Sequence, residues 1–264
     1  MKRKSKLIIV VMLLGIAVTS FAQTEDAAAI VDKSRNRIDA KTIQTRSRMV
    51  VAAKDGSTSN RVLDQFSKDG SKGEHRVVVE FKHSSNPANI INTRFLTIEN
   101  AEARDDQWIY LPSAGKVRRI ASSGGSGSFV ETDLSYDDIS SADRDPGLDT
   151  HRILREEDYK GKPCYVIEST PKDSGYQYTK MVQWIDKANS VNYKIELYDK
   201  KGTHVKTLEI LELKDVQGRL SPMVTKMSTL AAGTSTTINV DILRYDSEIP
   251  ESVFTPRYLE TGRP

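Results

Sequence analysis

The sequence predicts a mainly β fold, in which an antiparallel sheet curls into a barrel or half-barrel. About a dozen strand-like segments follow one another at intervals of roughly ten residues, with Gly-, Asn- and Asp-containing turns between them. Helical segments do not alternate with these strands, which argues against a βαβ fold. A sheet of that many strands tends to curl rather than stay flat.

The cleanest strand shows which face of the sheet is apolar. In residues 191–198, Val191, Tyr193, Ile195 and Leu197 share one face, and polar or charged residues stand between them. Such alternation buries one face of a strand and leaves the other in water. The apolar side of the sheet must therefore be covered by the N-terminal helix, by a lid or by a ligand.

The first residues predict a signal peptide over residues 1–22. A basic start at residues 2–6 precedes an apolar run over residues 7–18, and Ser20 and Ala22 are small residues at the cleavage positions. That run is shorter than the ~20 apolar residues that cross a bilayer as a helix. Residues 23–264 are then one mature domain. A lipid anchor is not expected, because the only Cys of the chain is Cys164, far downstream.

A short helix is predicted directly ahead of the strands, over residues 26–38. One face of it carries Ala27, Ile30, Val31, Ser34 and Ile38 at helical spacing. Acidic residues at its start and basic residues near its end suit the helix dipole. Its alanines make it narrow enough to lie close against a sheet.

The strands follow in two series. The expected strands are residues 42–53, 60–68, 74–82, 94–99, 107–111 and 116–120, and then 152–159, 164–170, 178–185, 191–198, 205–216, 220–230 and 234–245. Trp108 and Tyr110 share one face of their strand. They are either ordinary core residues or an aromatic wall of a ligand cavity.

Residues 121–150 interrupt this regular succession of strands. The segment opens with a Gly- and Ser-rich run and ends in an acidic stretch around Pro146. Long loops of this kind inside compact domains are usually functional or disordered. We interpret the segment as a lid or gate, whose apolar positions are Phe129, Val130, Leu134, Tyr136 and Ile139.

Composition and motifs argue against several classes of function. The chain has 39 basic and 36 acidic residues. The predicted signal peptide contains four of the basic residues and none of the acidic ones, so the mature part has 35 basic and 36 acidic residues. A nucleic-acid binder would carry a clustered basic surplus. The four histidines are isolated, the acidic loop lacks EF-hand spacing, and no Gly-x-Ser-x-Gly elbow occurs. We therefore expect no metal, no cofactor and no catalysis, and we expect Cys164 to be a buried strand residue.

The central block of the sequence resembles a known family. Residues 95–99, 106–112, 116–120 and 127–138 are similar to those of outer-membrane lipoprotein-sorting proteins, in the LolA/LolB-like branch associated with RND-type exporters. Shorter stretches of the sequence also resemble that family, over residues 161–167, 184–186, 198–202 and 254–259. The resemblance covers most of residues 30–260.

The resemblance implies a strongly curved half-barrel with a helical lid over an apolar cavity, which shields acyl chains during passage across the periplasm. The partners would be lipid acyl chains or lipidated proteins, and an RND-type inner-membrane transporter is a further candidate. Nucleic acid is not expected. Candidate cavity and lid residues are Ile30, Val31, Phe95, Trp108, Tyr110, Phe129, Leu134, Tyr136, Ile139 and Trp184.

In the best-known carrier of that family, an Arg on a barrel strand bonds to the lid and controls its opening. Candidates for that role here are Arg94, Arg118 and Arg119. The leading hypothesis is a periplasmic carrier or chaperone for lipids or lipoproteins. The alternative is an accessory partner of an RND-type exporter without carrier activity. A lipid hydrolase would need a nucleophile beside a base, for which the sequence has no signal.

Overall fold

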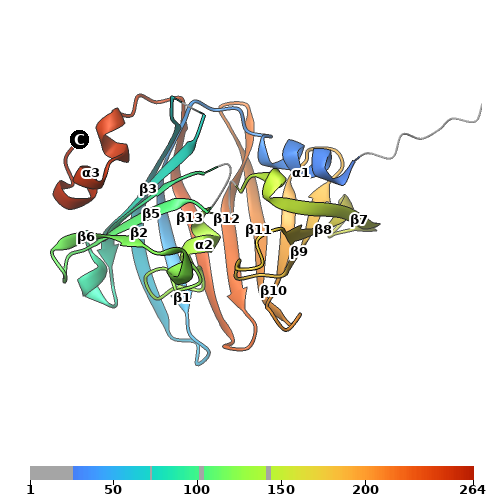
Figure 1. Ribbon diagram of the computed structural model, residues 1–264, viewed down its shortest axis with the longest axis horizontal. Helices are drawn as coiled ribbons and strands as arrows, with labels where there is room; N and C mark the ends of the chain where they lie inside the picture. Colours follow the sequence, from blue (N-terminus) through green and yellow to red (C-terminus); the bar gives the residue numbers. More distant parts are fainter. Residues whose placement is uncertain (1–25, 72, 101–103, 141–143) are drawn as a thin grey trace, which may run out of the picture.

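All strands of the described residues lie in a single 13-stranded antiparallel sheet (Figure 1). The computed structural model describes residues 26–264 except 72, 101–103 and 141–143, so the predicted signal peptide lies outside the described residues. The strands are β1 (Thr42–Ala52), β2 (Thr58–Asp69), β3 (His75–Ser84), β4 (Arg94–Ile98), β5 (Asp106–Leu111), β6 (Lys116–Ile120), β7 (Asp149–Asp158), β8 (Pro163–Pro171), β9 (Lys180–Asp186), β10 (Asn192–Tyr198), β11 (His204–Val216), β12 (Arg219–Thr229) and β13 (Thr234–Tyr245).

The sheet is a half-barrel whose two edges do not meet. Its order is β6-β5-β4-β3-β2-β1-β13-β12-β11-β10-β9-β8-β7, so every neighbour is also a sequence neighbour except the β1–β13 pair. That pair runs from Ile43 opposite Tyr245 to Ala52 opposite Ser235 and joins the two series of strands. The edges are β6 and β7, which are consecutive in the chain. The predicted curled antiparallel sheet is confirmed.

The segment that links these edges, residues 121–148, crosses the concave side of the sheet. We call it the crossing segment; its described part contains α2 (Tyr136–Ser140) and short 3-10 turns at Ser122–Gly124 and Pro146–Leu148. Phe129 is buried among strand residues, with its ring 5.2 Å from that of Phe95 and 5.8 Å from that of Phe81. Edge-to-face aromatic contacts of this kind add to the burial energy. The crossing segment therefore supplies the core beneath β1–β5.

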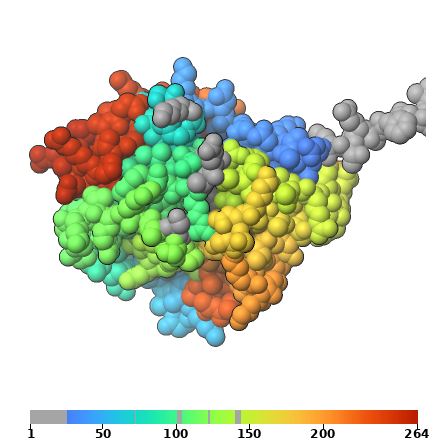
Figure 2. Space-filling view, viewed as in Figure 1, coloured from blue at the N-terminus to red at the C-terminus, as the bar shows by residue number. Residues whose placement is uncertain are grey.

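The N-terminal helix covers a different part of the concave face. Helix α1 (Ala27–Arg35) is capped by Asp26, whose carboxylate accepts a hydrogen bond from the Ala28 N–H at 3.3 Å. Ala27 and Ile30 are buried against Ile167 of β8 and Ile185 of β9. In the space-filling view α1 lies against the strands at the β7–β8 end of the sheet (Figure 2). The predicted helix is therefore confirmed, although it ends at Arg35 rather than at residue 38.

The convex face is covered at the opposite end by the C-terminal residues, which the sequence analysis did not expect to be helical. A 3-10 turn (Glu251–Phe254) and α3 (Pro256–Thr261) pack over β3–β6 (Figure 1). Tyr258 and Leu259 are buried there in a second apolar cluster, to which Trp108 and Tyr110 also belong.

A buried ion pair fixes α3 to the sheet. The Arg94 guanidinium donates from Nε to Glu80 Oε1 at 3.1 Å and from Nη1 to the Leu259 carbonyl at 3.0 Å. The Tyr258 hydroxyl donates to the other Glu80 oxygen at 3.3 Å. Both charged side chains are at most 10% exposed. Removing one partner of such a pair leaves an uncompensated charge in the interior.

Substituting Arg94 tests this anchor. We expect Arg94→Gln to lower the free energy of unfolding by about 2–3 kcal/mol, because Glu80 then keeps only the partly exposed Lys82, at 2.9 Å, as a cationic partner. The control is Arg119→Gln, which removes an ion pair with Asp106 whose side chains are 66% and 39% exposed and should cost at most about 1 kcal/mol. Urea unfolding measures both, and equal losses would contradict the anchoring role.

Cys164 is a buried strand residue, as predicted. Its thiol is inaccessible, and burial raises its pKa to about 11, with the nearby Asp186 carboxylate adding to the effect. Since the thiolate is the reactive form, only about 0.1% of the thiol is ionised at pH 8. We expect a thiol reagent to leave the native protein unmodified for hours and to react at once in denaturant. Rapid modification of the folded protein would show that this strand opens.

Candidate functional site

The concave face contains a cavity between helix α1 and the crossing segment. Its volume is about 750 Å³, within the roughly 300–1,000 Å³ typical of ligand pockets. Helix α1 and the residues after it form one side, and the crossing segment forms another through Leu134. The apolar strand residues of its wall are Ile43, Met181, Ile195, Leu197, Leu208, Ile210 and Met227.

Strand register builds this wall as a continuous apolar row. Ile195 of β10 stands opposite Leu208 of β11, which stands opposite Met227 of β12. Side chains directly opposite each other in a sheet lie on the same face and contact one another. Ile195 and Leu208 remain partly exposed in spite of these contacts. The row is thus an apolar surface that the protein's own side chains do not fill.

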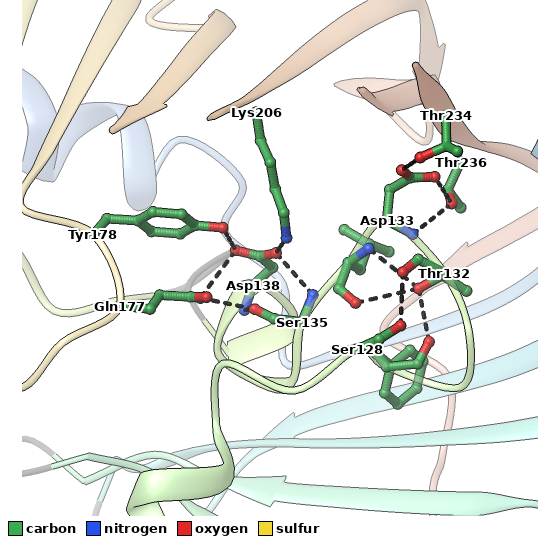
Figure 3. A network of polar contacts seen from close by, with 12 residues as sticks. Ser128, Thr132, Asp133, Ser135, Asp138, Gln177, Tyr178, Lys206, Thr234 and Thr236 are labelled. Atoms are coloured by element: carbon green, nitrogen blue, oxygen red, sulfur yellow. Dashed lines mark hydrogen bonds and ion pairs between the residues drawn. The ribbon is translucent and has the colours of Figure 1, made fainter. Parts of the chain in front are cut away.

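The crossing segment is held in place by two buried carboxylates (Figure 3). Asp138 accepts hydrogen bonds from the Ser135 N–H and the Tyr178 hydroxyl, both at 2.8 Å, and from Lys206 Nζ of β11 at 2.8 Å. Burial, with the Asp138 charge beside it, raises the pKa of Tyr178, so the hydroxyl stays a donor at neutral pH. Charge-assisted bonds are stronger than neutral ones. Asp138 therefore latches the segment to the β9–β11 side of the sheet.

Asp133 is the second of these carboxylates, and it attaches the crossing segment to β13. Its carboxylate accepts a hydrogen bond from Thr236 Oγ1 at 2.8 Å and another from Thr234 Oγ1, while its N–H donates to Thr236 Oγ1 at 2.9 Å. The two carboxylates thus tie the crossing segment to both sides of the concave face (Figure 3).

Arg61 is a candidate functional residue that was not predicted from the sequence. It is 2% exposed, and its guanidinium donates from Nη1 to the Val130 carbonyl of the crossing segment. Its Nε has no hydrogen-bond partner, and burial lowers its pKa despite the charge of Glu131. Val130 and Glu131 have φ values of 48° and 55°, which are unfavourable for residues with a side chain.

A signal for Arg61 is present in the sequence. Arg61 is two positions before Leu63, so it falls on the apolar face of β2, where a charge is costly unless it has a partner. The resemblance implied an Arg on a barrel strand that bonds to the lid, and Arg61 has that arrangement.

Two of the three predicted gating arginines lie away from the crossing segment, and the third lies near it. Arg94 faces the convex side and holds α3. Arg119 also faces that side, where it contacts Asp106 and lies over the Trp108 ring at 6.0 Å. Arg118 is exposed on the edge strand β6, but it stands opposite Ile109 and so faces the concave side, where its charge acts on Tyr136 of the crossing segment. Sequence position alone did not distinguish them from Arg61.

Most of the predicted lid residues are brought together. Phe95, Phe129, Leu134, Tyr136 and Ile139 belong to one cluster under the crossing segment. Of these, Leu134 also lines the cavity. From α1, Ile30 packs on the sheet and Val31 lines the cavity.

Three predicted cavity aromatics lie on the wrong face. Trp108 and Tyr110 pack against the C-terminal residues. Trp184 alternates with Gln183 and therefore points to the convex side, where its Nε1 donates to Glu157 Oε1 at 3.0 Å. Period-two spacing correctly assigned Trp108 and Tyr110 to a common face, but that face is covered by a helix rather than by a ligand.

One Ser–His pair lies next to the cavity. His151 Nδ1 is 2.8 Å from Ser169 Oγ, and His151 Nε2 is 2.9 Å from the Pro146 carbonyl. Ser169 is fully buried and also accepts a hydrogen bond from Gln183 at 2.6 Å. A nucleophile must reach its substrate. This pair therefore links β7 to β8, and the buried Ser169 hydroxyl is out of reach of a substrate.

Two further properties concern metals and membranes. No group of three or more His, Cys, Asp or Glu is placed to bind a metal ion within the described residues. In the described part of the chain, which begins at residue 26, no helix has the length and apolar character needed to cross a membrane.

The fold is similar to solved structures. A predicted outer membrane lipoprotein-sorting protein domain from Vibrio parahaemolyticus is 27% identical, with a TM-score of 0.82, over 89% of this chain and 98% of that one. A DUF1329 family protein from Desulfovibrio piger is also 27% identical, with a TM-score of 0.82, over 88% and 97% of the two chains. A LolA superfamily protein from Nitrosomonas europaea is 22% identical, with a TM-score of 0.70, over 89% and 99%, which shows the shared fold.

Sequence comparison adds one match. A protein-family model described as "Uncharacterized protein" matches residues 73–261, which is more than half of the chain. No curated protein matches the sequence.

Substituting Asp138 tests the latch. We expect Asp138→Asn to increase amide hydrogen exchange across residues 128–139 about tenfold, because the ion pair with Lys206 is lost. The matched control is Asp137→Asn, since the neighbouring Asp137 carboxylate has an unpartnered buried oxygen and burial raises its pKa. The control should leave exchange unchanged or slower. Equal acceleration in both variants would mean that the Asp138 contacts do not hold the segment.

Proposed function

The chain belongs to the outer-membrane lipoprotein-sorting, LolA-like family, and from this premise we propose that it is a periplasmic carrier that shields the acyl chains of lipids or lipoproteins on their way to the outer membrane. The cavity carries this proposal. An apolar row across β10–β12 faces a space of about 750 Å³ that no side chain of the protein fills.

The energetics of burial support a carrier. Each methylene removed from water contributes about 0.8 kcal/mol. Burying about eight methylenes therefore gives ~6 kcal/mol before the cost of association is subtracted. That affinity is enough to extract part of a chain and still allows release.

Loading and release need a cover that moves. Helix α1 is anchored by few apolar side chains, since only Ala27 and Ile30 are buried. The crossing segment is held more firmly, through Phe129 and the two carboxylate latches. Mobile elements come from the least stable parts of a structure. We therefore assign entry to the α1 side of the cavity.

The signal peptide predicted at residues 1–22 and the family's role in lipoprotein sorting support the proposed periplasmic location. An accessory role beside an RND-type exporter would require the same location. It would use the concave side as a docking groove and would not need lipid to enter.

The test compares two neighbouring positions on β11. Ile210 lines the cavity, whereas Leu211 is 50% exposed and does not. We expect Ile210→Trp to fill the space and weaken binding of a fluorescent fatty-acyl probe at least about tenfold, while Leu211→Trp leaves binding unchanged. Native mass spectrometry of the purified protein should also show bound lipid. No uptake by the unmodified protein would reject the carrier and favour the accessory role.

A further inference from the structure

The cavity has a charged rim next to its apolar wall. The end of α1 and the residues that connect it to β1, residues 34–40, all line the cavity. Within this stretch Arg35 contacts Glu99, the residue directly after β4. A second cationic side chain of the wall, Arg144, lies 2.9 Å from Asp149. These two positive charges are therefore neutralised within the protein.

Arg37 differs from them. Its guanidinium is half-buried and donates from Nη1 to the backbone carbonyl of Leu220 at 2.5 Å, a neutral acceptor. No carboxylate of the described residues lies within ion-pair distance of it. Burial lowers its pKa, an effect that Tyr245 and Tyr193 partly offset. Its positive charge has no counter-charge from the protein.

Both polar and apolar residues line the cavity around Arg37. Asn36 and Asp39 are close to it in the chain, and Ile38, Pro222 and Ile210 supply apolar surface. The contact with Leu220 places Arg37 at the start of β12, two residues before Pro222. A hydrocarbon chain in the cavity would therefore end close to an unpaired cation.

We propose that Arg37 binds the anionic headgroup of a lipid whose acyl chain occupies the cavity, so that the protein selects phosphate- or carboxylate-bearing amphiphiles over neutral ones. The guanidinium presents a planar set of donors that matches either anion. The acylated end of a lipoprotein has no such anion, so the inference assigns a free anionic lipid as cargo. It rests on the proposed function, because the chain must enter the cavity.

Three ligands with the same tail test this selection. Dodecyl phosphate, dodecanoate and dodecanol are titrated below micelle formation against a displaced fluorescent probe. We expect the unmodified protein to bind the two anions about tenfold more tightly than the alcohol, the size of effect that one charge-assisted hydrogen bond produces. The ratio between the two anions distinguishes a phosphate from a carboxylate headgroup. The preference should shrink as salt is added.

Variants of the same segment locate the effect. Arg37→Gln should abolish the preference by weakening only the anions, and Arg37→Lys should retain part of it. The control is Asp39→Asn, an exposed rim residue of opposite charge, which should keep or increase the preference. A thermal melt checks that each variant is folded.

The outcomes separate the two proposals. If Arg37→Gln weakens all three ligands equally, or leaves the preference intact, Arg37 is not the headgroup site. If the unmodified protein binds dodecanol as tightly as the anions, the headgroup inference is wrong, and the proposed carrier function is still supported. If none of the three binds, both are wrong.

Discussion

A sheet that curves without closing leaves a concave face that must be covered, and this constraint organises the protein. The β1–β13 pairing creates the face by joining two series of strands into one surface. An apolar face of that size cannot remain in water, because the hydrophobic effect scales with the exposed area. The crossing segment and α1 cover this surface, whereas α3 covers part of the convex face.

The covers divide the concave face into a filled part and an open part. The crossing segment inserts Phe129 among the side chains of β1–β5, where close packing excludes any ligand. Helix α1 packs on β8 and β9 through Ala27 and Ile30. Between them the row through Leu208 is left partly uncovered, which makes room for a guest molecule. The cavity is thus the space that remains between α1 and the crossing segment.

Polar contacts decide how firmly each cover is held. Asp133, Asp138 and Arg61 fix the crossing segment through charged groups placed in the interior. Buried charges are tolerated only when their partners are in place, so they define one position of the segment sharply. Helix α1 is held by its apolar face and by one ion pair, between Arg35 and Glu99, whose side chains are both partly exposed. This difference in attachment is the physical basis for assigning entry to the α1 side.

Local sequence patterns were sufficient for the curled antiparallel sheet, the N-terminal helix and the buried Cys164, and they marked residues 121–150 as an interruption of the strands. Each depends on the spacing of apolar residues along one stretch of chain, which is a local property. The spacing also put Trp108 and Tyr110 on a common face. Only the tertiary structure decided which face that was, because α3 and the Arg94–Glu80 pair come from distant parts of the chain. Arg61 was hidden for the same reason: its partner, the Val130 carbonyl, is a backbone atom brought close only by folding.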